Sequence, residues 1–237
     1  MKREWVSPKS KVLDFAYRLV ALVGAALPQI SVPSYVARHL NARLSGRNGA
    51  VVVDLGCGCG ERYEALARML KFRPISVGVE LHAPSAAAAK RVYDDVVLGD
   101  VRLLPIRAGS YDVALALDVV EHLEKEEAVS LLRFLKPRVM SIMTTPNGFQ
   151  PSRECPDNPY QEHKCGFVHD ELEALGYRIY GLWGLKRLSA PDNLLPAPVL
   201  GAVVTIARLL SQVLLRCEGK PELASCLVAV RNAEPSR

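Results

Sequence analysis

The chain has 237 residues, of which 49% are hydrophobic and 23% are charged, a composition typical of a globular protein with a sizeable core. Its net charge of +5 is mild and its arginines are scattered along the chain, which disfavours a nucleic-acid interface. The first residues, MKREWVSPKS, lack the apolar core of a secretory signal. We therefore expect a cytoplasmic protein whose six cysteines are reduced thiols.

The N-terminal part predicts two helices. Apolar residues recur at helical spacing over 9–27, and again over the shorter stretch 34–44, with a proline-containing break at 28–33 between them. A glycine- and serine-containing loop follows at 45–49. We interpret residues 1–47 as a helical extension that packs on a core domain formed by residues 48–237.

From residue 50 onward, apolar runs alternate with amphipathic segments. Strands are predicted at 50–55, 75–80, 95–100, 111–117 and 138–145, and helices at 61–71, 84–92 and 124–135. Because the runs are continuously apolar, the pattern predicts a doubly wound α/β fold with a mostly parallel sheet covered on both faces.

The C-terminal part departs from this alternation. A polar loop at 146–167, of the length that usually carries function, precedes a short helix at 169–175 and a strand at 177–183. Prolines and an arginine interrupt the apolar stretch 194–217, so we expect a largely buried helix and no transmembrane segment. Contact with a membrane surface stays an alternative for that helix. A last strand is predicted at 222–230.

The segment VVVDLGCGCGE joins the first predicted strand to its helix. Its glycines follow the pattern G-x-G-x-G, and Glu61 stands where a dinucleotide fingerprint has its third glycine. Glu61 and Asp54 would repel a pyrophosphate at this helix start. The loop therefore favours a ligand with a positively charged group and disfavours a nicotinamide dinucleotide.

Acids also mark the ends of the next three predicted strands, at Glu80, Asp100 and Asp118. The carboxyl ends of parallel strands meet at one edge of a sheet, where ligands bind in open α/β folds. Four strands that each end in an acid at the same edge predict a binding site. Glu80 is positioned to accept hydrogen bonds from ribose hydroxyls, and Asp100 from an adenine amino group.

Together these segments resemble the class I S-adenosylmethionine-dependent methyltransferases. VVVDLGCGCG, VGVEL, LGDVRLLPI and YDVALALDVVEHL are similar to the family's four cofactor motifs, in order and at the usual spacing. The resemblance implies a seven-stranded sheet with its last strand inserted antiparallel, and S-adenosyl-L-methionine as cofactor. It assigns cofactor binding to the loop residues Asp54, Leu55, Gly56, Cys57, Gly58 and Gly60 (methionine part), to Glu80 with Leu81 (ribose), to Asp100 and Val101 (adenine), and to Asp118 and Val119 (methionine side).

Two histidines are the candidate general bases. His122 follows the fourth predicted strand, and His163 lies in a stretch, H…GF…L…LGY, that resembles the family. Each has a structural alternative, His122 as a helix-start residue and His163 as a surface residue of the loop. Cys57 and Cys59 are expected to contribute backbone contacts only. Cys155, His163, Cys165 and His169 fit no usual zinc spacing, so no metal is predicted.

Two motifs that the sequence lacks reduce the range of possible methyl acceptors. DVVE replaces the (D/N)-P-P-(Y/F) of enzymes that methylate exocyclic amines, and TTPNG has no cysteine for methylation at base C5. We predict methyl transfer to an O, N or C nucleophile of a small or medium acceptor, with a small-molecule substrate favoured over nucleic acid. A non-catalytic cofactor-binding or interaction module, and a protein or RNA methyltransferase, stay as alternatives. The sequence makes no prediction of oligomeric state.

Overall fold

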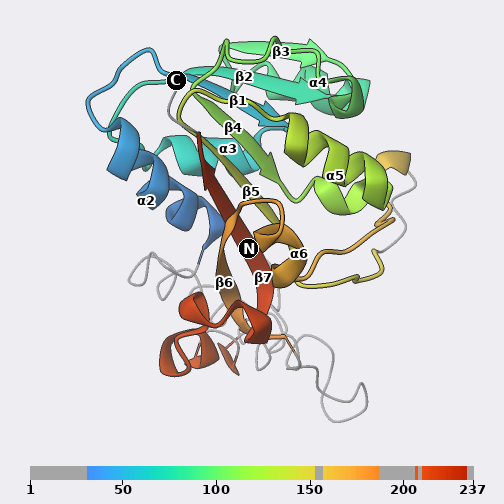
Figure 1. Cartoon of the computed structure of the whole chain (residues 1–237). Helices are drawn as coiled ribbons and strands as arrows, with labels where there is room; N and C mark the ends of the chain where they lie inside the picture. Colours follow the sequence, from blue (N-terminus) through green and yellow to red (C-terminus); the bar gives the residue numbers. More distant parts are fainter. Residues whose placement is uncertain (1–30, 153–156, 187–205, 208–209, 234–237) are drawn as a thin grey trace, which may run out of the picture.

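The computed structural model describes residues 31–152, 157–186, 206–207 and 210–233. Seven strands form one sheet in the order β3-β2-β1-β4-β5-β7-β6 (Figure 1). All neighbouring strands are parallel except β7, which is antiparallel to both β5 and β6. The predicted doubly wound α/β fold with an antiparallel last strand is thus confirmed. The strands are β1 (Val51–Leu55), β2 (Ile75–Glu80), β3 (Asp95–Leu98), β4 (Val113–Leu117), β5 (Met140–Pro146), β6 (Arg178–Leu185) and β7 (Ala224–Asn232).

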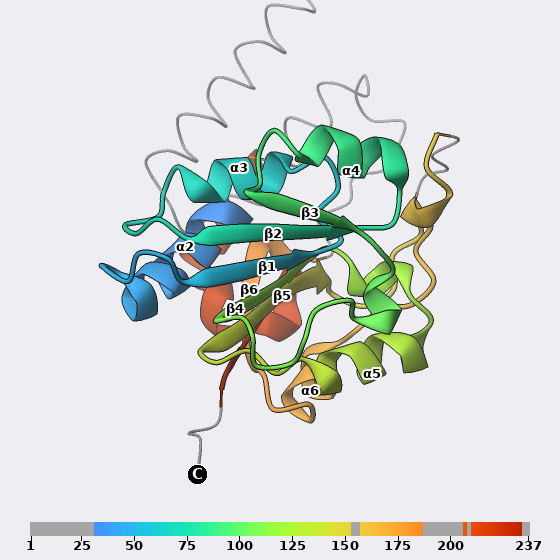
Figure 2. The ribbon, with the colours of Figure 1, turned by 90° about the horizontal axis from the view of Figure 1, so that it is seen from above.

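Helices cover both faces of the sheet (Figure 2). One face carries α2 (Val32–Leu44), α3 (Glu61–Ala67) and α4 (Ala83–Ala89), and the other carries α5 (Lys125–Phe134) and α6 (His169–Glu173). Successive residues of β4 alternate between the two apolar cores, with Leu115 and Leu117 on the α2 side and Ala116 on the α5 side. This alternation explains why the strands read as continuously apolar.

The first described helix, α2, is part of this core. Ser31 caps it by accepting a hydrogen bond from the Ser34 backbone N–H at 3.2 Å, and its apolar face is fully buried through Val36, Leu40 and Leu44. The helix predicted at 34–44 is confirmed, with a start two residues earlier. The helix predicted at 9–27 lies outside the described residues, and the division of the chain at residue 47 stays a prediction.

Helix α3 ends four residues earlier than its periodicity predicts. The side chain of Asn41, on α2, donates to the Met69 carbonyl at 2.9 Å and accepts from the Lys71 N–H at 2.7 Å. These two bonds satisfy backbone groups that would otherwise continue the helix. The difference therefore arises from a tertiary contact that local sequence does not encode.

The apolar stretch near the C-terminus is described only in part. Residues 206–207 and 210–214 are helical, and the rest of the predicted helix lies outside the described residues. Within the ranges that the structure covers, no helix is long and apolar enough to cross a membrane.

A tight contact holds β6 against the segment that precedes β7. A Cβ built on Gly181 would lie 2.3 Å from the Cys217 carbonyl oxygen and 2.5 Å from the Ala224 Cβ. We expect Gly181→Ala to lower the free energy of unfolding by about 3 kcal/mol, the upper end of the usual cost of overpacking, in urea denaturation. Gly219→Ala is the control, since no atom lies within 4 Å of its built Cβ. Equal stability of the two variants would contradict the packing.

Candidate active site

The glycine loop between β1 and α3 adopts a backbone that favours glycine. Gly56, Gly58 and Gly60 have φ angles of 64°, 56° and 88°, in the left-handed region. A Cβ on Gly56 would lie 2.7 Å from Val119 Cγ2, so the loop packs closely on the segment after β4. Gly58 has open space beside it, which leaves its backbone accessible to a ligand.

The two loop cysteines differ in environment. Cys57 is buried, and its N–H donates to the Val79 carbonyl at 3.1 Å. Burial raises the pKa of the Cys57 thiol well above its usual value, so it is uncharged at neutral pH. Cys59 is exposed. These environments accord with the expectation of backbone contacts without thiolate chemistry, which stays a prediction.

Asp54 lies in the β1 strand just before the loop and is 3% exposed. The Tyr93 hydroxyl donates a hydrogen bond to its Oδ2 at 2.6 Å. Burial raises the pKa of Asp54 to about 6, although the Tyr93 bond and the nearby Arg62 oppose the shift. Asp54 is therefore a buried residue beneath the glycine loop. Near pH 6, part of the Asp54 population is protonated.

The raised pKa of Asp54 predicts a pH-dependent stability. Its pKa is about 6 in the folded protein and about 3.9 in an unfolded chain, so its contribution is full below pH 4 and is lost as the pH rises through 6. In urea unfolding from pH 4 to 7.5, we expect wild type to lose up to about 3 kcal/mol relative to Asp54→Asn, which cannot titrate. A difference between the two proteins that does not change with pH would contradict the assignment.

Glu80, the last residue of β2, is anchored by the glycine loop. Its Oε2 accepts from the Gly58 N–H at 2.9 Å, and its Oε1 accepts from the His82 N–H at 2.8 Å. Each carboxylate oxygen has a second lone pair, and Glu80 lines a cavity together with Leu81. The side chain is thus fixed in orientation and still able to accept hydrogen bonds from a ligand.

Asp100 follows β3 and is held by Arg102. Its carboxylate caps the 3-10 turn η1 (Val101–Leu103) by accepting from the Arg102 N–H at 2.9 Å, and it also forms a bidentate pair with the Arg102 guanidinium. Arg102 in turn contacts Glu127 of α5 at 3.1 Å. The pair with Arg102 lowers the pKa of Asp100, which keeps it ionised beside the cavity.

Asp118 directly follows β4 in a strained conformation, with a φ angle of 56°. The Thr144 hydroxyl donates to its Oδ1 at 2.7 Å, and Arg62 of α3 forms an ion pair with its Oδ2. The strain and the two partners together place the Asp118 carboxylate across from the glycine loop.

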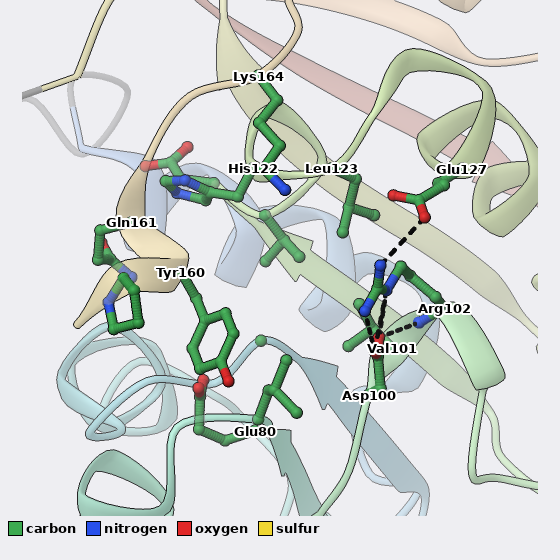
Figure 3. Close-up of a pocket in the computed structure, with 15 residues that line it drawn as sticks. Glu80, Asp100, Val101, Arg102, His122, Leu123, Glu127, Tyr160, Gln161 and Lys164 are labelled. Atoms are coloured by element: carbon green, nitrogen blue, oxygen red, sulfur yellow. Dashed lines mark hydrogen bonds and ion pairs between the residues drawn. The ribbon is translucent and has the colours of Figure 1, made fainter.

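These residues line two adjoining cavities. The first cavity is bordered by Glu80, Asp100, Val101, Val119 and Tyr160 among others, and Figure 3 shows Tyr160 and Lys164 reaching into it from the loop above. The second cavity is bordered by Gly58, Cys59, Arg62, Glu121 and His163 among others. Gly56, Asp118, His122 and Gln161 border both, so the two cavities form a continuous site at the carboxyl ends of the strands.

The two predicted base candidates lie side by side. The rings of His122 and His163 have centroids 4.8 Å apart in an edge-to-face arrangement, although 40 residues separate them in the chain. Burial lowers the pKa of His122, which keeps its imidazole neutral. Both histidines border the second cavity, and their role as bases stays a prediction.

The loop after β5 closes the site from above. It is tied at both ends, since the Gly148 N–H donates to the Phe167 carbonyl at 2.7 Å and the buried Asn147 amide donates to the Ala224 carbonyl at 2.8 Å. Its 3-10 turn η3 (Pro159–Gln161) borders the first cavity. Of the other predicted residues, His169 begins α6, Cys165 is buried with its thiol toward the Val120 carbonyl, and Cys155 lies outside the described residues.

Three site residues were not among the predicted set. Arg62 and Arg102 neutralise Asp118 and Asp100, and Glu121 is buried beside His122, with 2% of its surface exposed. The ion pair between Asp100 and Arg102 could have been predicted, because the two residues are only two positions apart in the chain. No local pattern indicates the Arg62 contact or the burial of Glu121.

Comparison with known proteins points to one family. A family profile described as a methyltransferase domain matches residues 53–142, which contain the glycine loop and all four acidic strand ends. A probable S-adenosylmethionine-dependent methyltransferase of Mycolicibacterium smegmatis is 28% identical over 156 residues, or 63% of this chain. These matches support the class I S-adenosylmethionine-dependent methyltransferase family for this chain. Its family cofactor is S-adenosylmethionine.

Solved methyltransferase structures share the fold. A SAM-dependent methyltransferase from Archaeoglobus fulgidus has a TM-score of 0.51 at 19% identity and covers 90% of this chain and 94% of its own. The plantazolicin methyltransferase BpumL, solved in complex with SAH, has a TM-score of 0.53 at 14% identity over 97% of this chain and 91% of its own. The chain spans only 59% of the length of its Mycolicibacterium relative.

Proposed function

We propose that this chain is an enzyme that transfers a methyl group from S-adenosylmethionine to an O, N or C nucleophile of a small or medium acceptor. The observation that carries the proposal is Glu80, a buried carboxylate that the Gly58 and His82 N–H groups orient on the wall of the first cavity. It is the group that a ribose diol needs at this position of the fold.

The charges around the site fit this cofactor better than a phosphate-containing one. Asp54, Glu80, Asp100 and Asp118 stand at the ends of four neighbouring strands, and the glycine loop carries no lysine or arginine. The cofactor has an ammonium, a sulfonium and no phosphate, and when bound it supplies an activated methyl group. We assign the ribose to Glu80 with Leu81, the adenine to Asp100 and Val101, and the methionine part to the Asp54–Gly60 loop with Asp118 and Val119.

The chain itself then has to bind the cofactor and the acceptor, orient them toward each other, and exclude water from the site. Val101, Val119 and Leu123 give the first cavity an apolar wall, and Tyr160 and Lys164 cover it from the loop (Figure 3). The proposed acceptor space is the second cavity, where His122 and His163 meet. A neutral His122 is suited to accept a proton from an acceptor, and its role as a base stays a prediction.

Calorimetry separates the proposal from its alternatives. We expect micromolar binding of S-adenosylmethionine and no binding of NAD. The protein is then incubated with S-adenosylmethionine and each of a panel of hydroxyl, amine and carbon acceptors. Formation of adenosylhomocysteine would show turnover. Cofactor binding without turnover of small molecules, RNA or protein would favour the non-catalytic module, and turnover of RNA or protein alone would replace the small acceptor. Absence of cofactor binding would overturn the proposal.

We also propose the cytoplasm as the location of this enzyme. The five cysteines within the described residues are all free thiols, as is usual in a reducing compartment. Fractionation of the native host cells, with immunodetection of the chain, would test this location.

A further inference from the structure

Three side chains of metal-ligand type converge where the two cavities meet. Glu121 and His122 belong to the 3-10 turn η2 (Val120–His122), and His163 comes from the loop after β5. One candidate ligand atom of each residue lies within 4.8 Å of those of the other two. The set considered from the sequence is Cys155, His163, Cys165 and His169, and only the fold shows that Glu121 and His122 lie beside His163.

The hydrogen bonds of both histidines leave the same ring nitrogen free. His122 Nδ1 lies 3.1 Å from the Glu162 carbonyl oxygen, and His163 Nδ1 lies 2.6 Å from the Gln150 carbonyl oxygen. A carbonyl oxygen only accepts, so each Nδ1 must carry the proton, and in the neutral ring each Nε2 then has a free lone pair. Orientation of an imidazole through a backbone carbonyl is typical of metal-binding histidines.

Glu121 supplies the second, independent observation. Its side chain is 2% exposed, and its Oε2 is buried with no hydrogen-bond partner among the described residues. A buried carboxylate oxygen that lacks a partner is costly. A cation at this position would remove that cost.

The backbone holds the two segments of the cluster in register. The N–H groups of Lys164 and Cys165 both donate to the Glu121 carbonyl, at 2.7 and 3.1 Å. The His163 N–H donates to Ser152 Oγ at 2.9 Å. The segment that carries His163 is therefore held beside the η2 turn by the backbone bonds of the next two residues.

We propose that Glu121, His122 and His163 bind a divalent cation on the wall of the second cavity. Two imidazole nitrogens and one carboxylate favour Zn²⁺, Co²⁺ or Mn²⁺ over the all-oxygen preference of Ca²⁺ and Mg²⁺. The three ligands leave coordination positions open toward the cavity. The two histidines then act as ligands and not as the general bases that sequence analysis predicts.

A cation here also indicates an acceptor class, and this part rests on the proposed function. A hydroxyl bound to the open positions would have a lowered pKa and would be held next to Asp118 and the glycine loop. An oxygen nucleophile is therefore favoured among the O, N and C acceptors.

The metal site is tested without cofactor or acceptor, so its outcome is independent of methyl transfer. Full-length protein is treated with chelator, dialysed, and titrated with Co²⁺ by absorption and with Zn²⁺ by equilibrium dialysis and elemental analysis. We expect one equivalent bound, with a cobalt spectrum lacking thiolate charge-transfer bands. Glu121→Gln and His163→Asn should each weaken Zn²⁺ binding by at least about 100-fold, the upper end of the loss seen when a ligand merely loses its hydrogen-bond partner.

Matched controls keep the result specific. His169→Asn changes a histidine at the start of α6, where it pairs with Asp170, and should retain wild-type binding. The double variant Cys57→Ser, Cys59→Ser should also retain one equivalent, and circular dichroism verifies the fold of each variant. Absence of binding by wild type, unchanged binding by folded Glu121→Gln and His163→Asn, or loss of binding with the cysteine pair would overturn the proposal.

Discussion

Replacing Glu80 by alanine should weaken S-adenosylmethionine binding by about 100- to 10,000-fold in calorimetry. A hydrogen bond to a charged group contributes about 1.5–3 kcal/mol, and a ribose diol offers two of them. The variant also removes the acceptor of the Gly58 and His82 N–H groups, at 2.9 and 2.8 Å, so the loop loses the anchor that presents its backbone to the ligand.

Two further variants separate these contributions. Glu80→Gln keeps the length of the side chain and should lose less affinity than alanine, because its amide oxygen still accepts a hydrogen bond. Glu64→Ala removes an acid from the exposed side of α3, where it pairs with Arg68, and should bind like wild type. If Glu80→Ala and Asp54→Ala, as two single variants, both bound the cofactor with wild-type affinity, the cofactor site would lie elsewhere.

Replacing Arg231 by alanine should lower the free energy of unfolding by about 3 kcal/mol or more. The Arg231 guanidinium, on β7, donates to the carbonyl oxygens of Leu175, Leu132 and Leu135 at 3.2, 2.6 and 3.1 Å, and it stacks 4.6 Å from the Tyr177 ring centroid. Charged hydrogen bonds contribute about 1.5–3 kcal/mol each, and two of these satisfy the C-terminal carbonyls of α5.

Chemical denaturation with Arg178→Ala as the control tests this. Arg178 is exposed on β6 and lies 5.4 Å from the Tyr180 ring centroid, so its loss should cost under about 1 kcal/mol. Arg231→Lys should recover only part of the stability, because one ammonium cannot reach three carbonyls in the geometry of a guanidinium. Similar losses for Arg178→Ala and Arg231→Ala would contradict the role assigned to Arg231.

Much of the fold could be predicted from the continuously apolar runs that form the strands. The strand predicted at 75–80 is β2 itself, and the other predicted strands differ from the observed ones by one or two residues at most ends. The helices are less well bounded, because tertiary contacts such as that of Asn41 end α3 early. Strand lengths are set by burial on both faces, which the sequence displays directly, whereas helix ends depend on partners distant in sequence.

The candidate site likewise has features that the sequence predicts and features that depend on contacts distant in sequence. The acids at the ends of β1 to β4 could be predicted, because parallel topology brings strand ends to one edge whatever their side chains do. The contact of His122 with His163 depends on the path of the loop after β5, and the burial of Glu121 depends on that loop covering it. Both are long-range properties, and neither leaves a periodic signal in the chain.

The insertion of β7 between β5 and β6 orders the assembly of the molecule. Among the described strands β6 lies at the edge of the sheet with β7 as its one neighbour, and residues 186–223 are synthesised between the two. As the chain leaves the ribosome, β1, β2 and β4 can pair with their neighbours, whereas β5 lacks β7 on one side and β6 has unpaired N–H and C=O groups. A nascent chain stalled before residue 224 would therefore expose an unpaired strand edge at β5 as well as at β6, and such edges are sites of aggregation.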